Sequence, residues 1–373
     1  MRILIDLTSL YDNFSGIELY ACNVTKELIK NNNNYYILVF KNEIYKLFSD
    51  TQPNVEKIVI KGKNKLYFQQ FKLLHYIKKI NADKYLFFAF TQPYFFFNKN
   101  TINTIHDVSC FDCKGSNRKI MILYWKLMFK RISRGKNKIL TVSNFSKNRI
   151  NKVLGIDKSR IIVTYSAKSK FSYDFYYDKE LNDETKNKFL LPQKYILALS
   201  TLEPRKNFRL LVCAYSNLLK DEKIDEDLII VGRRGWLVDN ILDGLDDCVK
   251  SRIHFTGFVD DKYLPYIYLN SQLFLFPSKY EGFGVPPLEA MSFKTLVLSS
   301  NASAMPEILG DGAIFFDPNS QVDLENKIML CLNMDSKEKS EIIEKGYSIS
   351  QQYKWESVAD IINREILYNG EIK

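Results

Sequence analysis

The sequence is short of cysteine and contains no long apolar run. Its 373 residues include six cysteines, too few for a disulfide framework, and the single C-x-x-C pair, Cys110 and Cys113, lacks the second pair that a zinc site would need. The most apolar stretch, residues 85–97, is interrupted by Thr91-Gln92-Pro93 and is shorter than the ~20 residues of a transmembrane helix. Asp6 lies where an export signal would have its apolar core. We therefore expect a cytoplasmic protein whose thiols are reduced.

Two motifs are also missing, and each absence disfavours a class of function. No G-x-G-x-x-G follows the first predicted strand, which disfavours a dinucleotide-dependent oxidoreductase. No nucleic-acid recognition motif accompanies the basic residues, so we expect no nucleic acid as a partner. With 46% apolar residues, the chain is long enough to form two domains, each with its own core.

The net charge of +10 hides an uneven distribution. Residues 1–175 contain 30 Lys and Arg against 12 Asp and Glu, whereas the remaining residues contain 23 against 31. Cations are densest between Lys114 and Lys138, where they alternate with Ile, Leu, Trp and Phe as in a helix that lies on a membrane surface. A solvated helix face is the alternative for any single residue. The excess over the whole N-terminal half favours an anionic partner, and a membrane surface is the one we expect.

Short apolar strands alternate with amphipathic helices, which predicts α/β domains with parallel sheets built from βαβ units. The rhythm breaks over residues 168–191, which we interpret as the linker between two Rossmann-like, doubly wound domains that face a cleft. We expect a basic N-terminal domain over residues 1–175, a C-terminal domain over residues 176–352, and a final helix over residues 353–373 that packs back toward the N-terminal domain. The predicted strands are residues 3–7, 36–40, 57–60, 85–90, 101–105, 139–142, 161–165, 195–199, 228–231, 252–256, 272–276, 295–299 and 313–316.

The strongest functional motif is K-Y-E-G-F-G-V-P-P-L-E-A-M, residues 279–291, directly after a predicted strand. Its two glycines let the backbone pass close to a ligand, and its two prolines suit the first turn of a helix. A strand, a glycine loop and a helix N-terminus in this order can hold a diphosphate. Glu281 lies on the loop, and Glu289 lies within the helix, where it can accept hydrogen bonds from ribose hydroxyls. A glycine turn with two solvated glutamates is the alternative.

The second motif is S-T-L-E-P-R-K-N, residues 200–207, which again runs from a strand end to a helix start. Breaking a sugar–phosphate bond builds negative charge on the phosphate oxygen. Arg205 and Lys206 would supply positive charge at the point where such a leaving group needs it. Asn207 is predicted to cap the following helix. Two solvated loop cations are the alternative.

Together the two motifs resemble those of the large retaining glycosyltransferase family 4, which has the GT-B fold and includes bacterial mannosyltransferases of surface-polysaccharide synthesis. The resemblance extends over nearly the whole chain, with the motifs in the right order. The further matching segments are residues 9–20, 104–109, 141–147, 231–236, 255–259 and 300–307.

The resemblance implies a nucleotide sugar held mainly by the C-terminal domain and an acceptor held mainly by the N-terminal domain. Arg205 and Lys206 would contact the diphosphate, and Glu289 would bind the ribose. Gly16 would let the N-terminal domain close over the donor. The remaining donor-binding residues that it implies are Gly282, Phe283, Gly284 and Val285.

The resemblance also implies three catalytic residues, His106, Lys206 and Glu281. His106 ends a predicted strand, and together with Glu281 it would lie by the transferred sugar. No carboxylate in the motifs is clearly a nucleophile, so we favour front-face substitution with the departing phosphate as the base. The one D-x-D, residues 225–227, precedes a strand instead of following it. We therefore expect no essential metal, and no cofactor other than the nucleotide-sugar co-substrate.

The sequence departs from the family pattern in three places. Glu18 and Leu19 replace the glycine and arginine of the first loop, which leaves that loop's phosphate contact open. Lys294 stands where the family has glycine, and Ser200 stands where many relatives have an arginine. Relatives with the E-P-R-K-N loop commonly lack this arginine, so Arg205 is expected to supply the second cation.

The expected function is transfer of a hexose, with retention, to a saccharide or a polyprenyl-diphosphate-linked acceptor in lipopolysaccharide or other surface-polysaccharide synthesis. GDP-mannose is the first candidate donor, and dTDP- and UDP-linked sugars are the alternatives. A nucleotide-sugar epimerase on the same fold and a non-catalytic, membrane-associated partner protein are the rival functions. We expect the protein to be peripheral at the inner face of the membrane.

Overall fold

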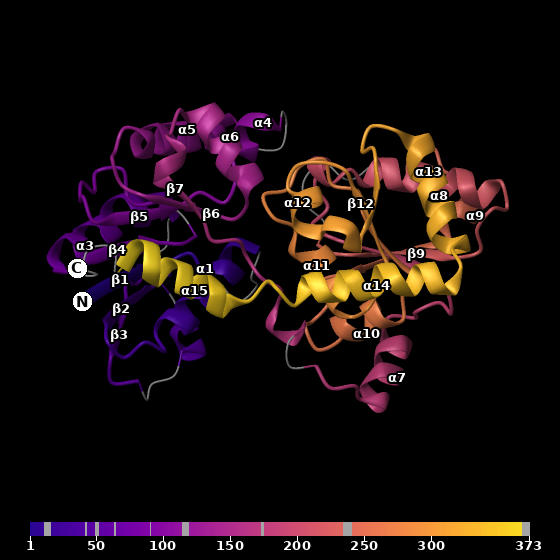
Figure 1. The fold of residues 1–373 in the computed structure, drawn as a ribbon, viewed down its shortest axis with the longest axis horizontal. Helices are drawn as coiled ribbons and strands as arrows, with labels where there is room; N and C mark the ends of the chain where they lie inside the picture. The colour runs from indigo at the N-terminus through magenta and orange to yellow at the C-terminus, as the bar shows by residue number, and fades with distance from the viewer. Residues whose placement is uncertain are drawn as a thin grey trace. The chain divides into compact units, whose positions relative to one another are not determined.

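The computed structural model describes residues 1–10, 16–41, 43–48, 52–62, 65–89, 91–113, 119–172, 175–233 and 241–367. The chain forms two compact units (Figure 1). Unit 1 comprises mainly Met1–Asp112, Asn117–Ala167 and the segment that begins at Lys354, and unit 2 comprises mainly Lys168–Tyr353. Unit 1 is therefore assembled from both ends of the chain.

Unit 1 contains a parallel sheet of seven strands in the order β3-β2-β1-β4-β5-β6-β7. Because β1 lies between β2 and β4, the strand order reverses direction at β1, as in a doubly wound sheet. The strands are β1 (Arg2–Asp6), β2 (Tyr35–Phe40), β3 (Val55–Val59), β4 (Lys84–Phe87), β5 (Thr101–Thr104), β6 (Ile139–Thr141) and β7 (Ile161–Val163).

Helical segments connect the strands of unit 1, and the last two belong to the C-terminal segment. They are α1 (Gly16–Leu28), η1 (Glu43–Leu47), α2 (Lys65–Tyr67), η2 (Phe68–Leu73), α3 (Leu74–Lys79), α4 (Ser109–Asp112), α5 (Lys119–Ser133), α6 (Asn144–Leu154), η3 (Lys158–Arg160), α15 (Trp355–Ile362) and η7 (Asn363–Leu367). Helix α15 packs against α1, which places the end of the described chain in unit 1.

Unit 2 repeats the same plan with a parallel sheet of six strands in the order β10-β9-β8-β11-β12-β13. The reversal of strand order here falls at β8, which lies between β9 and β11. The strands are β8 (Tyr195–Leu199), β9 (Asp227–Val231), β10 (Ile253–Gly257), β11 (Leu273–Phe276), β12 (Val297–Ser300) and β13 (Ile314–Phe316).

The helical segments of unit 2 are η4 (Lys170–Ser172), α7 (Lys179–Lys188), η5 (Pro204–Lys206), α8 (Phe208–Lys220), α9 (Asp247–Lys250), α10 (Leu264–Leu269), α11 (Val285–Ser292), α12 (Met305–Leu309), η6 (Gly310–Gly312), α13 (Gln321–Asn333) and α14 (Ser336–Ser350). Each of the thirteen predicted strands overlaps an observed one, so the prediction of two doubly wound α/β domains is confirmed. No helix in the described ranges is both long and apolar enough to cross a bilayer.

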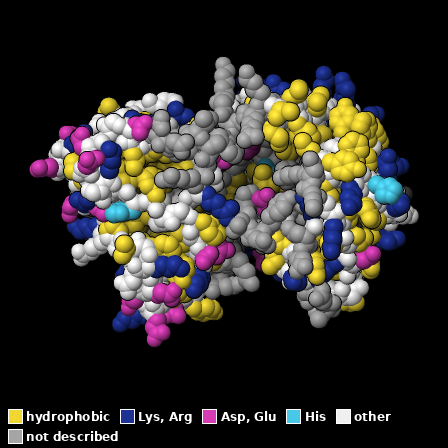
Figure 2. Space-filling model, turned by 180° about the vertical axis from the view of Figure 1, so that it is seen from behind, with side chains coloured by type: hydrophobic (Ala, Val, Ile, Leu, Met, Phe, Trp, Pro, Cys, Tyr) yellow, Lys and Arg dark blue, Asp and Glu magenta, His cyan; other side chains and the backbone are white. Residues whose placement is uncertain are grey.

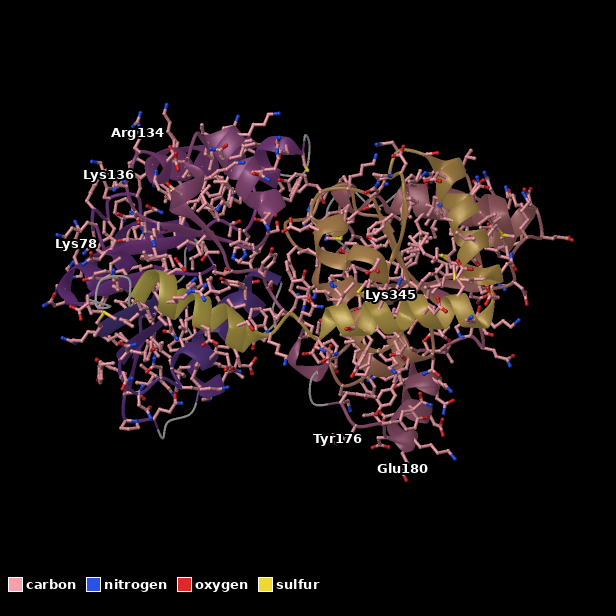
Figure 3. The ribbon with its side chains drawn as sticks, in the orientation of Figure 1. Lys78, Arg134, Lys136, Tyr176, Glu180 and Lys345 are labelled. Atoms are coloured by element: carbon pink, nitrogen blue, oxygen red, sulfur yellow. The ribbon has the colours of Figure 1, made fainter. Side chains whose placement is uncertain are left out.

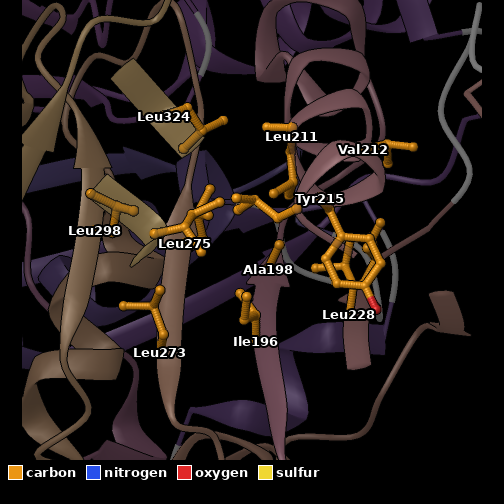
Figure 4. Close-up of a cluster of buried hydrophobic side chains, with 14 of the residues drawn as sticks. Ile196, Ala198, Leu211, Val212, Tyr215, Leu228, Leu273, Leu275, Leu298 and Leu324 are labelled. Atoms are coloured by element: carbon orange, nitrogen blue, oxygen red, sulfur yellow. The ribbon is translucent and has the colours of Figure 1, made fainter. Parts of the chain in front are cut away.

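Apolar residues form these strands because both faces of each sheet are covered by helices. In unit 2, Ile196 and Ala198 of β8 lie in one buried cluster with Leu273 and Leu275 of β11 (Figure 4). Tyr215 of α8 packs onto the same cluster, and its hydroxyl donates to the Glu226 carbonyl oxygen at 2.9 Å. The central strands β8 and β11 are thereby held rigidly, and the loops that follow them start from fixed positions.

The segment predicted to be the linker differs from its prediction. The structure assigns it to unit 2 from Lys168 onward, earlier than the predicted boundary after residue 175, and it contains helix α7. The Asp178 side chain caps α7 by accepting from the Leu181 N–H at 3.2 Å. The helix buries only Asn182 and Thr185, so its sequence has no apolar period to reveal it.

Two glycines let α14 approach η6 in unit 2. A Cβ atom on Gly312 would lie 2.5 Å from the Gly346 Cα atom, and one on Gly346 would lie 2.9 Å from the Gly312 carbonyl oxygen. Backbone therefore meets backbone, with no flexible side chain that could move aside. Helix α14 also packs against α11, as Figure 1 shows, and α11 belongs to the candidate site described below.

Replacing Gly312 by Ala should destabilise unit 2, because either the helix or the loop must shift. We expect the free energy of unfolding to fall by about 1–3 kcal/mol, as for other overpacked positions, in a urea titration. The matched control is Ser340→Ala on the exposed side of the same helix, which should be neutral or slightly stabilising. Wild-type stability of the Gly312→Ala variant would show that the contact is not tight.

Candidate functional site

Two loops meet at the carboxyl edge of the unit 2 sheet. Strands β8 and β11 pair in parallel, with Ile196 opposite Leu273, so the loops that follow them leave the sheet side by side. The loops are residues 200–207 and residues 277–284. They are joined directly by the Lys279 N–H, which donates to the Arg205 carbonyl oxygen at 2.8 Å. The two sequence motifs therefore form one site, at the point where the strand order reverses.

The charged side chains of the two loops contact one another. Lys206 Nζ lies 2.5 Å from Glu281 Oε1, and Arg205 Nη1 donates to Glu281 Oε2 at 3.1 Å. Arg205 also donates to the Tyr280 carbonyl oxygen at 3.0 Å and, through Nε, to Glu203 at 3.1 Å. Both predicted cations thus lie on one carboxylate, Glu281, instead of pointing into solvent.

The ion pair between Lys206 and Glu281 is buried, with only 8% and 7% of the two residues exposed. Burial alone would raise the pKa of Glu281, but the charges of Lys206 and Arg205 outweigh it and hold that pKa at about 2. Burial lowers the pKa of Lys206, and Glu281 opposes this effect. Glu281 is therefore an anion at any physiological pH, and its charge favours the protonated form of Lys206.

Two serines that the sequence motifs did not identify fix Glu281 in place. Ser278 Oγ donates to Glu281 Oε1 at 2.5 Å, and the Glu281 N–H donates to Ser303 Oγ at 2.8 Å. Ser278 is fully buried between the strand and the glycine loop. Its place in the F-P-S triplet directly after β11 is the only sequence signal that could have pointed to it.

The glycine loop leads into helix α11 as predicted. Gly284 precedes the helix with φ of +90°, a left-handed backbone conformation that favours glycine. Val285 begins the helix, and prolines fill its first turn. Phe283 is buried, with its ring edge-on to Tyr353 at 5.4 Å. Gly282 completes the loop between Glu281 and Phe283. Proline has no N–H, so the Gly284 and Val285 N–H groups are the ones at this helix start that can donate to an anion.

Glu289 lies within α11 and is 5% exposed. Its carboxylate accepts from Tyr268 Oη at 3.0 Å and from Ser169 Oγ. Burial raises the pKa of Glu289, and the two hydroxyl donors partly offset this effect. Burial and the nearby Glu289 charge raise the pKa of Tyr268 well above its usual range. Tyr268 and Ser169 were missed in the sequence because they lie on other elements, far from Glu289 along the chain.

Asn207 precedes helix α8 as predicted but does not cap it. Its backbone is left-handed (φ 60°), and its side chain makes no capping hydrogen bond; Nδ2 instead donates to the Pro318 carbonyl oxygen at 2.9 Å. The residue ties the loop of residues 200–207 to the segment after β13. Gly232 supports the same loop from the other side, since a Cβ atom there would lie 2.0 Å from the Ser200 carbonyl oxygen.

His106 lies in unit 1, just beyond β5, and is half-buried. Its Nε2 atom lies 2.8 Å from the Phe88 carbonyl oxygen, which can only accept, so Nε2 carries the proton. The ring meets Tyr20 edge-on at 5.1 Å between centroids. Burial lowers the pKa of His106, which favours the neutral ring with Nδ1 as a hydrogen-bond acceptor.

Several predicted features include residues that the structure does not describe, or lie next to such residues. Gly16 is the first residue of α1, and a Cβ atom there would have no neighbour within 4 Å. Residues 11–15 of the same first loop, 114–118 of the basic segment and 234–240 lie outside the described residues.

In the D-x-D, Asp227 begins β9 and accepts from His254 Nε2 at 2.6 Å, a structural contact. Across the described ranges, no three His, Cys, Asp or Glu side chains are grouped to hold a metal.

Comparison with known proteins finds a family match within unit 2 and relatives that align over more than half of the chain. Residues 180–349 match the family described as glycosyl transferases group 1. The chain is 33% identical over 260 residues to O-antigen chain mannosyltransferase B of Escherichia coli, an alignment that covers 69% of this chain and 68% of that protein. It is 29% identical over 226 residues to the serotype-specific mannosyltransferase WbdA of E. coli, covering 60% of this chain but only 28% of WbdA.

The fold is also found among solved structures. Anabaena Alr3699/HepE in complex with UDP and glucose superimposes with a TM-score of 0.73 at 15% identity, covering 98% of this chain and 99% of that one. At this identity the similarity shows the fold alone, and it confirms the predicted pair of Rossmann-like domains.

Replacing Glu281 by Gln should destabilise unit 2 at neutral pH by about 3 kcal/mol, because buried Lys206 loses its counter-charge. The pKa of Glu281 is held at about 2, below its ordinary value of 4.5. Its contribution to stability is therefore complete above pH 4.5 and is lost as the pH falls toward 2. The difference in free energy of unfolding between wild type and Glu281→Gln should shrink in urea titrations run at successively lower pH.

The control for this series is Glu341→Gln on the exposed side of α14, which should differ little from wild type. If Glu281→Gln lowers the free energy of unfolding by the same amount from neutral to acid pH, then hydrogen bonding, and not charge, accounts for the contribution of Glu281 to stability.

Proposed function

Because the chain belongs to the glycosyl transferases group 1 family, we propose that it transfers mannose from GDP-mannose to a saccharide or lipid-linked saccharide in surface-polysaccharide synthesis, with retention of configuration. The observation that carries this proposal is the contact of Arg205 and Lys206 with Glu281, beside the N-terminus of α11. Two cations and the backbone N–H groups of Gly284 and Val285 together suit a diphosphate.

The donor diphosphate is proposed to bind Arg205, Lys206 and the segment Gly282–Val285. The Glu281 carboxylate forms ion pairs with both cations, and Arg205 also pairs with Glu203. A diphosphate would add negative charge next to them, and the charge that develops on the leaving phosphate would be stabilised by groups that are already in place. The Lys206 side chain is buried, and its ammonium group lies 5.5 Å from the centre of the Phe276 ring.

Glu289 is proposed to accept hydrogen bonds from the ribose hydroxyls of the donor. Its two oxygens already accept from Ser169 and Tyr268, but each carboxylate oxygen can accept more than one hydrogen bond. The mannosyltransferase names of two relatives favour mannose, for which GDP is the proposed carrier. The UDP in the solved structure of similar fold supports the alternative of a UDP-sugar, and a dTDP-sugar remains the third candidate.

Retention is proposed to proceed by front-face substitution. The bond from the sugar C1 to the phosphate oxygen breaks, and a bond from C1 to the acceptor oxygen forms on the same face. The acceptor proton passes to the departing phosphate oxygen. Glu281 is poorly suited to be the nucleophile of a two-step route, because both its oxygens are held by cations and a pKa of about 2 makes it a weak base.

His106 is proposed to contact the transferred sugar. The protonated Nε2 is held by the Phe88 carbonyl, which leaves Nδ1 as an acceptor for a sugar hydroxyl. The first-loop glycine, Gly16, is proposed to allow unit 1 to close over the donor. No essential metal is proposed, since Arg205 and Lys206 supply the charge that a metal would otherwise provide.

Binding and turnover of donors test the proposal. At a hundred times its Kd, the correct nucleotide sugar should stabilise the protein by about 2.7 kcal/mol, and a thermal melt against GDP-, UDP- and dTDP-sugars should identify it. Glu289→Gln should lose this shift. With an acceptor present, Lys206→Met should lower kcat at least ~100-fold, while the exposed control Lys337→Met should not, and NMR of the product should show the donor's anomeric configuration.

The same assays separate the rival functions. A nucleotide-sugar epimerase would change the sugar of the donor without any acceptor. A non-catalytic, membrane-associated partner protein would not turn the donor over in any mixture. An inverted product would contradict front-face substitution, and full activity of Lys206→Met would contradict the assignment of the site.

We also propose that unit 1 contacts an anionic membrane surface, at the inner face of the cytoplasmic membrane. Figure 2 shows apolar side chains gathered on one face of unit 1 (upper right), with Lys and Arg side chains around them. Helix α5 has the predicted amphipathic character: Leu123 and Leu127 are 58% and 50% exposed, next to exposed Lys126 and Lys130. Exposed leucines between lysines suit the interface of an anionic bilayer.

Vesicle sedimentation tests this contact. Replacing both Lys126 and Lys130 by Gln should weaken binding to phosphatidylglycerol vesicles by about 2 kcal/mol, or ~30-fold, at low salt. Leu123→Asp should also weaken binding. The matched control is Leu330→Asp, a leucine of unit 2 that is 45% exposed, which should bind as wild type does. Equal binding to vesicles of neutral phosphatidylcholine would contradict the electrostatic part of the proposal.

A further inference from the structure

Unit 1 contains a cavity at the edge of its sheet opposite to His106. It is formed where β5 and β6 begin, since Lys99 precedes β5 and Lys138 directly precedes β6. His106 follows the end of β5, and the strands are parallel, so the cavity and His106 lie at opposite edges of the sheet. The cavity has a volume of about 220 Å³, the space of about seven waters at ~30 Å³ each. It is separate from the site described above.

The wall of the cavity is built from amides that are already hydrogen-bonded to one another. Asn103 Nδ2 donates to Gln92 Oε1 at 3.0 Å, and the Gln92 N–H donates back to Asn103 Oδ1 at 2.8 Å. Asn137 Nδ2 donates to the Asn98 carbonyl oxygen at 3.1 Å, and Arg160 donates to the Asn137 carbonyl oxygen. The wall is therefore preorganised and does not need to rearrange around a ligand.

The cations that line the cavity have no carboxylate partner among the residues that the structure describes. Within the described ranges, neither Lys99, Arg131 nor Lys138 forms an ion pair. Lys138 uses one N–H on the Glu365 carbonyl oxygen at 2.9 Å. The Arg131 guanidinium lies over the ring of Phe97, 4.2 Å from its centre, and its buried Nε has no hydrogen-bond partner in the described part of the chain. The positive charge of the cavity is therefore not neutralised.

Two further cations lie next to the cavity lining in the sequence. Arg134 and Lys136 flank Gly135, which lines the cavity, and Figure 3 shows both side chains pointing outward from unit 1. Like charges that line one cavity repel one another unless an anion lies between them. Their concentration around one preorganised cavity indicates a ligand with more than one negative charge.

We infer that this cavity binds a phosphate or diphosphate group, held by Lys99, Arg131 and Lys138 against the amide wall. The inference does not rest on the proposed transfer reaction, because none of its residues belongs to the donor site. The planar Arg131 guanidinium has paired N–H donors that match the spacing of phosphate oxygens. Lys99 before β5 and Lys138 before β6 add positive charge.

The phosphate group could come from a lipid headgroup or from a small soluble phosphate. Phe97 at the edge of the cavity is 71% exposed, and the neighbouring Phe95 is 54% exposed. Exposed aromatic rings beside a phosphate site would suit the first part of a lipid chain, whereas a soluble phosphate would not use them. The experiment below distinguishes the two sources.

Isothermal titration of the full chain with inorganic diphosphate tests the site. Lys99→Gln and Arg131→Gln should each weaken diphosphate binding to the cavity at least tenfold. Lys206→Met, which changes the donor site of unit 2, should leave binding to the cavity unchanged. The matched control is Lys152→Gln, an exposed lysine of α6 that lies outside the cavity. Lys99 is exposed and has no hydrogen bond in the described structure, so its variant keeps the test valid if Arg131→Gln folds poorly.

Sedimentation with phosphatidylcholine vesicles, with and without polyprenyl phosphate, identifies the source. If Lys99→Gln weakens binding to the doped vesicles as well as to diphosphate, the ligand is a lipid headgroup. If it weakens only diphosphate binding, the ligand is a soluble phosphate. If Lys99→Gln and Arg131→Gln bind both probes as Lys152→Gln does, or if Lys206→Met abolishes all diphosphate binding, the inference is overturned.

Discussion

The buried contact of Lys206 with Glu281 is the interaction on which the candidate site of unit 2 depends. It joins two loops whose residues lie 75 positions apart in the chain, and it places two charges where each would be unstable alone. Ser278 and Ser303 hold the carboxylate, and Arg205 shares it. A site of this kind keeps its cations in place before any ligand arrives. That is the condition under which fixed charge stabilises a leaving phosphate without first having to reorganise.

The doubly wound topology explains why these residues meet. In each unit the first strand lies inside its sheet. The loops after β8 and β11 therefore emerge together, although α8, α9 and α10 and the strands β9 and β10 separate them in sequence. The same topology repeats in unit 1, where His106 follows β5. The opposite edge of that sheet, where the strands begin, does not contain His106. Lys99, Arg131 and Lys138 line a separate cavity there. The two edges of one sheet can thus serve different ligands.

Much of the site could be predicted, because its main residues lie in short motifs directly after strands. Arg205, Lys206 and Glu281 lie in loops, and Glu289 lies in a helix, directly after strands whose apolar runs a doubly wound sheet buries. Ser169 and Tyr268 could not be found in this way, since they reach Glu289 from a connecting segment and from α10. Helix α7 was missed because capping by Asp178 and two polar buried residues stabilise it, without an apolar period.

The sequence by itself determined the class of fold, the apolar segments that form strands, the two motifs and the family. Each of these depends on residues close together in the chain, where periodicity, glycine and proline act locally. Only the tertiary structure decided that Arg205 and Lys206 lie on Glu281, that Asn207 ties its loop to Pro318 instead of capping α8, and that unit 2 begins at Lys168. These depend on which distant groups are buried together. Burial sets the energy of a charge through its neighbours in space, which no local pattern records.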